Sequence, residues 1–131
     1  MSDAETGAIV EHESAVDFEA TVALVTAAIS GAGLIVFGRF DHDARARDVG
    51  LEMPKTVVIS YGHPKGGTPV MVAAPLAALD LPLRVLVRER QDGRTVIAFH
   101  PVEQMMRRAG VPAALAGKLV PAQRLLVNAL G

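Results

Sequence analysis

The chain has 131 residues, half of them hydrophobic, and a formal net charge of -1, which suits one domain with a single core. Five aromatic residues, no tryptophan and no net positive charge argue against nucleic-acid binding, and the absence of cysteine excludes disulfides, zinc ribbons and thiol nucleophiles. The longest apolar run, Pro69 to Leu79, is too short to span a membrane, and the acidic N-terminus does not resemble a secretory signal, so we expect one soluble cytoplasmic domain over residues 1–131.

The first half of the chain predicts a strand, a helix and two further strands. We expect the first strand around Ala8 to Glu13 and a helix that Asp17 caps and that Gly31 and Gly33 end. Helical spacing predicts that one stripe of this helix is buried, namely Phe18, Val22, Val25 and Ile29. Two β-branched and aromatic runs predict strands over 34–40 and 56–62, and their polar connection predicts a helical turn over 44–49 that Gly50 closes.

The second half of the chain predicts a hairpin followed by helices. Asp92-Gly93 supplies turn chemistry between two alternating runs over 83–100. Alternation predicts one buried face, with Leu83, Val85 and Val87, and one wet or partner-facing side, with Arg84, Leu86, Arg88 and Arg90. A short helix should end at Gly110, and Pro112 and Pro121 should each open a helical segment.

Several motifs occur together in a recognisable order. Asp41-His42 ends one strand, Gly62-x-Pro64-Lys65 ends the next, and Gly-Thr-Pro at 67–69, "LDLPLRVLV" at 79–87 and a glycine-centred hairpin follow. Over roughly residues 8–110 the chain resembles the domain of unknown function 302 family of bacterial and archaeal proteins, with 111–131 as a C-terminal helical extension outside the resemblance. This chain has His63 where the family usually has asparagine, and His100-Pro101 where the family has other polar residues.

The resemblance implies a fold and an assembly but no reaction. The implied fold is α+β and two-layered, similar to the TATA-binding protein, with a curved antiparallel sheet of about five strands in β-α-β-β-β-β order and helices on one face. The resemblance also implies that such chains are often homodimers. It implies no enzymatic activity, because the family has no agreed biochemical function.

The glycine-rich loop after the predicted strand over 56–62 is the first candidate site. A nucleotide-binding P-loop is unlikely because Lys65 precedes Gly66 and Gly67. Thr68-Pro69 is typical of a helix N-cap followed by a first-turn proline, so free amides at the two glycines beside Lys65 would meet an anion. The alternative is that the glycines only turn the chain and Thr68 only caps a helix.

Asp41 and His42 form the second candidate site. His42 would act as a general acid or base that an aspartate orients, or Asp41 or Asp43 would simply cap the next helical turn. If the two strands pair antiparallel, His42 and His63 lie roughly 20 Å apart, so one metal ion cannot join them within a subunit, although a dimer could bring them together. We therefore expect no metal and no cofactor.

A strip of arginines on the hairpin is the third candidate site. Arg84 and Arg88 share one side of their strand with Arg90 and would bind a carboxylate or phosphate, or they form a solvated face. The charge distribution is also uneven, because residues 84–131 hold eight Lys or Arg against three acids, which could seat an anion or pair two subunits.

We therefore expect a non-catalytic homodimeric module that binds a small, anionic ligand or a protein partner. The ligand-binding candidates are His63, Lys65, Gly66, Gly67, Thr68, Arg84 and Arg88. The alternative is an enzyme that uses His42, with Asp41, on an anionic substrate.

Overall fold

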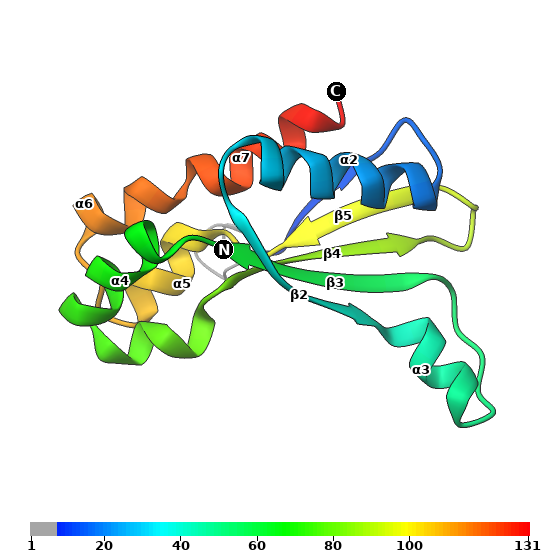
Figure 1. Cartoon of the computed structure of the whole chain (residues 1–131), viewed down its shortest axis with the longest axis horizontal. Helices are drawn as coiled ribbons and strands as arrows, with labels where there is room; N and C mark the ends of the chain where they lie inside the picture. The colour runs from blue at the N-terminus through cyan, green and yellow to red at the C-terminus, as the bar shows by residue number, and fades with distance from the viewer. Residues whose placement is uncertain (1–7) are drawn as a thin grey trace.

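The computed structural model describes residues 8–131, so the first seven residues of the acidic N-terminal stretch lie outside the described residues. Five antiparallel strands form one sheet in the order β1-β5-β4-β3-β2 (Figure 1). This arrangement confirms the α+β class and the antiparallel sheet predicted from the sequence. The strands are β1 (Val10–Glu13), β2 (Ile35–Asp41), β3 (Thr56–Gly62), β4 (Leu83–Glu89) and β5 (Thr95–Phe99).

The helices occupy three positions around this sheet. Helices α2 and α7 cover one face, α4, α5 and α6 gather beyond one end, and α3 extends from the opposite end (Figure 1). No helix in the described part of the chain is long and apolar enough to cross a membrane. The helices are α2 (Phe18–Gly31), α3 (His42–Asp48), α4 (Pro64–Ala73), α5 (Val102–Arg108), α6 (Ala113–Ala116) and α7 (Pro121–Ala129), with 3-10 turns η1 (Pro75–Asp80) and η2 (Gly117–Leu119).

Strand alternation divides the sheet into a covered face and an open face. On the covered face of β3 and β4, cross-strand pairs join Val57 to Val87 and Ile59 to Val85, and these side chains are buried. The predicted stripe of α2 is also buried, and the Asp17 carboxylate accepts a hydrogen bond from the Ala20 amide at 2.9 Å, as an N-cap should. The hydrophobic pattern and cap predicted for this half of the chain are confirmed.

The open face carries the arginines, and one edge of the sheet carries uncovered apolar side chains. Arg84 and Arg88 pair in register with Ser60 and Thr56 on this face. Strand β2 is an edge of the sheet, and its register shifts between Val36 and Gly38. Exposed apolar side chains along β2 leave this edge uncovered, namely Ile35, Val36, Phe37 and Phe40.

The C-terminal segment is tied into the core by polar and apolar contacts. The Tyr61 hydroxyl on β3 donates to the Ala122 carbonyl at 2.7 Å. The buried Gln123 side chain accepts from the Val102 amide at 2.9 Å and donates to the His100 carbonyl at 2.8 Å. Leu126 belongs to the same hydrophobic cluster as the sheet and α2, so α7 is an integral layer of the described structure.

Candidate functional site

The helix in the glycine-rich segment begins earlier along the chain than the sequence suggests. Helix α4 begins at Pro64, and His63 is its N-cap, with Nδ1 accepting from the Lys65 amide at 3.1 Å. Thr68 and Pro69 therefore lie inside the helix, and the expectation that Thr68 caps it is wrong. Pro64 explains the shift, because proline suits the first helical turn, where no backbone donor is needed.

The two glycine amides are already used by the helix. Gly66 and Gly67 both donate to the His63 carbonyl, each at 3.0 Å. The predicted pair of free amides is therefore wrong, because these groups close the first turn of α4. An anion at this loop would have to be held by side chains.

A cavity of about 460 Å³ opens beside this loop, where β3 enters α4 and the C-terminal segment crosses. Its volume lies within the range of roughly 300–1,000 Å³ that is usual for small-molecule sites. We call it the β3–α4 cavity. Its lining residues include four predicted candidates, namely His63, Gly66, Gly67 and Thr68, whereas Lys65 does not line it.

The walls of the β3–α4 cavity are mainly apolar. Side chains from five segments form them, namely Leu34, Phe37, Met71, Leu81, Pro82, Leu83, Leu119 and Ala122. An apolar wall of this kind favours the hydrocarbon part of a ligand.

A few polar groups interrupt this wall. Tyr61 is one, but its hydroxyl is bound to Ala122, and burial raises the pKa of Tyr61, so the phenol stays uncharged. His63 uses Nδ1 to accept from the Lys65 amide, which leaves Nε2 to carry the proton in the neutral ring. With Thr68 and Lys118, the cavity therefore has a hydroxyl, an imidazole and one ammonium.

Lys118 and Leu119 were missed by sequence reasoning. They belong to η2, more than fifty positions after the loop that they face. No local motif marks them, because only the packing of the C-terminal segment brings them to the cavity.

Asp41 and His42 lie at the other end of the β2–β3 pair. The register joins Asp41 to Val57 and Ile35 to Gly62, which confirms that His42 and His63 sit at opposite ends. Asp41 forms an ion pair with Arg39, Nε to Oδ1, at 2.8 Å. Both candidates line a separate cavity of about 350 Å³ with Arg39 and Arg45, so they do not join the loop in one site.

Asp43 is a structural carboxylate. It does not cap α3 from outside but lies inside the helix, where Oδ1 accepts from the Thr56 amide and Oδ2 pairs with Arg47, each at 3.0 Å. The Thr56 hydrogen bond and then the Arg47 contact lower the pKa of Asp43 against the opposing effect of burial. Asp43 thereby ties α3 to β3. Within residues 8–131 no three His, Asp or Glu side chains are grouped as a metal site requires.

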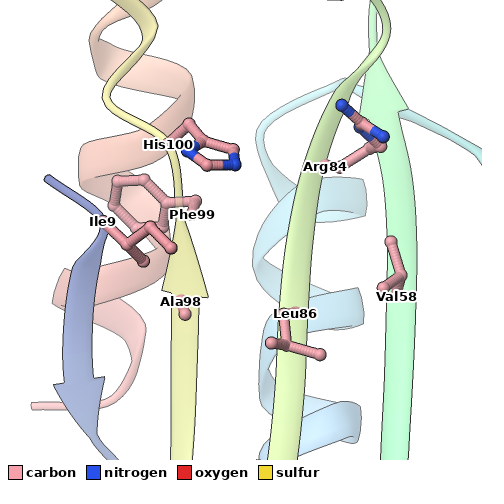
Figure 2. Close-up of a pocket in the computed structure, with 7 residues that line it drawn as sticks. All are labelled: Ile9, Val58, Arg84, Leu86, Ala98, Phe99 and His100. Carbon is pink, nitrogen blue, oxygen red and sulfur yellow. The ribbon is translucent and has the colours of Figure 1, made fainter. Parts of the chain in front are cut away.

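The arginine strip separates into paired and unpaired members. Arg88 pairs with Glu11 at 3.2 Å, and Arg90 pairs with Glu13 at 2.7 Å. In the described part of the chain Arg84 makes no ion pair. It lines a small pocket on the open face together with His100 (Figure 2).

The fold matches a solved structure closely in shape. A crystal structure of an uncharacterised conserved DUF302 protein from Bacillus stearothermophilus superposes with a TM-score of 0.80, covering 93% of this chain and 94% of that one. The two sequences are 16% identical, so this likeness shows the fold alone.

Curated relatives occur in Brucella. Proteins named fluoride-specific ion channel FluC 1, from Brucella suis and Brucella abortus, and FluC 2, from Brucella melitensis, are each 37% identical over 86 residues, which is 66% of this chain. The alignment covers 34% of the first and 32% of the other two. The chain therefore spans about a third of the length of the relatives that it matches.

The family model covers nearly the whole chain. It matches residues 10–130, twenty residues beyond the point where the motif resemblance ends, and so includes η2 and α7. The chain belongs to the family described as domain of unknown function DUF302.

Proposed function

We propose that this chain is a binding module that holds a small, largely apolar molecule with an anionic group in the β3–α4 cavity. The observation that carries the proposal is the lining of a cavity of about 460 Å³, which combines apolar walls with a cationic side chain. A wall of this composition stabilises the hydrocarbon part of a ligand, while a few polar groups fix its orientation.

The charge of the lining selects the ligand's polar end. Lys118 and His63 line the cavity, and no aspartate or glutamate does so within the described residues. Lys118 can donate a charge-assisted hydrogen bond, which is stronger than a neutral one, and Thr68 adds a hydroxyl. A carboxylate or sulfonate is therefore favoured over an amine.

A homodimer is the proposed assembly, and the β2 edge is its proposed contact. Phe37 is 50% exposed and Phe40 is 53% exposed. Edge strands with uncovered apolar side chains tend to pair with another chain. Phe37 also lines the β3–α4 cavity. A second copy against β2 would bury both phenylalanines and narrow the entrance to the cavity.

Binding can be tested with naphthalene-2-sulfonate, using naphthalene-2-methanol as an uncharged control. We expect the sulfonate to shift the NMR methyl signals of Met71 and Leu119. Lys118→Met should weaken its binding at least about tenfold, since an ionic hydrogen bond contributes roughly 1.5–3 kcal/mol. Arg124→Met, which removes a cation that does not line the cavity, is the matched control. Equal binding by both variants, or no shift at either methyl, would overturn the proposal.

The assembly is tested separately by sedimentation velocity. Phe37→Asp should convert a dimer to a monomer, whereas Val72→Asp, an equally drastic change at an exposed position of α4, should not. A wild-type monomer at high micromolar concentration would refute the dimer without affecting the ligand proposal.

The enzymatic alternative has less support. His42 lines a cavity with Arg39 and Arg45, but Asp41 is bound to Arg39 and makes no hydrogen bond to His42 in the part of the chain described. A general base needs a partner that orients it. A strongly shifted His42 pKa in an NMR titration would revive this alternative.

The names of the Brucella relatives support a second candidate function. In those proteins the segment like this chain is joined to a further two-thirds of sequence in a protein named as a fluoride channel. A partner role beside a membrane channel for a small anion is therefore our second proposal. Deleting the matching segment from a Brucella relative should change fluoride efflux from vesicles, and unchanged efflux would refute this role.

A further inference from the structure

A second pocket, of about 190 Å³, lies on the open face of the sheet. The β4–β5 ladder ends at the pair Leu86 and Ala98, and Figure 2 shows the two strands separating beyond that pair. Continuing the same register would place Arg84 opposite His100. Instead, the side chains of these two residues stand on either side of the gap, with the labelled apolar side chains around and below them (Figure 2).

The charge pattern around this pocket singles out Arg84. Arg88 and Arg90 on the same strand side have carboxylate partners in β1, Glu11 and Glu13. None of the described residues that line the pocket is acidic. The guanidinium of Arg84 therefore faces the pocket without a carboxylate partner. A planar guanidinium next to apolar surface binds a carboxylate well, because two parallel N–H groups match its two oxygens.

We propose that this pocket, the Arg84–His100 pocket, binds a small organic carboxylate with an apolar body. The carboxylate lies on the Arg84 fork, an imidazole N–H of His100 donates a further hydrogen bond, and the body contacts Leu86 and Ala98. A single fixed cation matches a monoanion in charge, whereas a phosphate dianion would remain partly uncompensated above an apolar floor.

The pocket is independent of the β3–α4 cavity. Leu83 lines that cavity, and Arg84 follows it in β4, so their side chains point to opposite faces of the sheet. The backbone of His100 is held in place, because its carbonyl accepts a hydrogen bond from the Gln123 side chain at 2.8 Å. The two proposed sites therefore lie on opposite faces of the sheet.

The test is an NMR titration of the full chain with sodium benzoate, using benzamide as the neutral isostere. We expect benzoate to shift the methyl signals of Leu86 and Ala98, and Arg84→Gln to weaken binding at least about tenfold. Arg88→Gln is the matched control, because it removes an arginine on the same strand side that is already paired. It should bind benzoate like the wild type.

Three results of the benzoate and benzamide titrations would overturn this inference. They are the absence of shifts at Leu86 and Ala98, equal binding by Arg84→Gln and the wild type, and equal shifts with benzamide. Parallel titrations with sodium fluoride and inorganic phosphate decide the ligand class, since tighter binding of either at this pocket refutes the carboxylate assignment. Signals from Met71 and Leu119 report on the β3–α4 cavity in the same spectra and keep the two proposals separate.

Discussion

Replacing Gln123 with methionine should destabilise the protein more than the same replacement at the neighbouring exposed Arg124. Pro101 precedes α5 and gives it no side-chain cap, so the Gln123 amide oxygen acts as the cap by accepting from the Val102 amide. The amide nitrogen satisfies the His100 carbonyl. Methionine keeps the length of the side chain but leaves both backbone groups without this partner.

The magnitude follows from those two groups. An unsatisfied buried donor costs about 1–3 kcal/mol. The His100 carbonyl is only partly buried, so water can replace its lost partner, and the loss should be about 1–3 kcal/mol, mainly from the Val102 amide. A typical domain has a total stability of about 5–15 kcal/mol. Urea unfolding followed by circular dichroism measures this change, with Arg124→Met as the control on the neighbouring exposed position. Equal unfolding midpoints for the two variants would show that the Gln123 bridge does not stabilise the fold.

Three further substitutions test individual contacts. Asp43→Ala should cost about 1–3 kcal/mol at pH 7. Because the folded pKa of Asp43 is lowered, this contribution should decrease as the pH falls below about 4 and the carboxylate becomes protonated; a difference between the two proteins that does not shrink with falling pH in urea melts contradicts this. Gly67→Ala should stabilise by about 1 kcal/mol, since a new Cβ meets nothing closer than 3.7 Å inside α4, and a lower melting temperature refutes it. Tyr61→Phe should cost roughly 1 kcal/mol in urea, and an unchanged midpoint would mean that its bond to Ala122 adds no net stability.

Local patterns were sufficient to predict most of the elements. The period of the apolar residues in α2, the alternation in β4 and the Asp92-Gly93 turn each depend on neighbours within a few positions. Gly93 adopts φ +83°, as a glycine in such a turn should. These signals need no knowledge of the tertiary structure, which is why the strand over 56–62 matches residue for residue.

Two local signals competed in the glycine-rich loop, and the weaker one prevailed. Thr68-Pro69 is the usual form of a helix start, but His63-Pro64 offers the same chemistry five positions earlier, because an imidazole nitrogen can also accept from a backbone amide. Glycine disfavours helix by about 1 kcal/mol relative to alanine, so Gly66 and Gly67 suggested a turn. Val70 of α4 is buried in the hydrophobic core, and tertiary packing of this kind overrides a weak intrinsic preference.

The candidate site was only partly predictable because its walls come from distant segments. His63, Gly66, Gly67 and Thr68 share a motif and a cavity, whereas Lys118 reaches the same cavity only through the C-terminal turn. Arg84 and Arg88 looked equivalent in the sequence. The pairing of β1 with β5 separates them, because it brings Glu11 within 3.2 Å of Arg88 and leaves Arg84 beside the open pocket.

Helix α7 connects the two proposed sites, since Ala122 lines the β3–α4 cavity and Gln123 holds the His100 carbonyl. Removing the Gln123 amide therefore releases the backbone at one side of the Arg84–His100 pocket, while Tyr61 still holds Ala122. In the folded fraction of Gln123→Met we expect benzoate binding to weaken and naphthalene-2-sulfonate binding to persist, both measured by the same NMR titrations. If both probes lose affinity equally, α7 moves as one body, and the two polar contacts do not act independently.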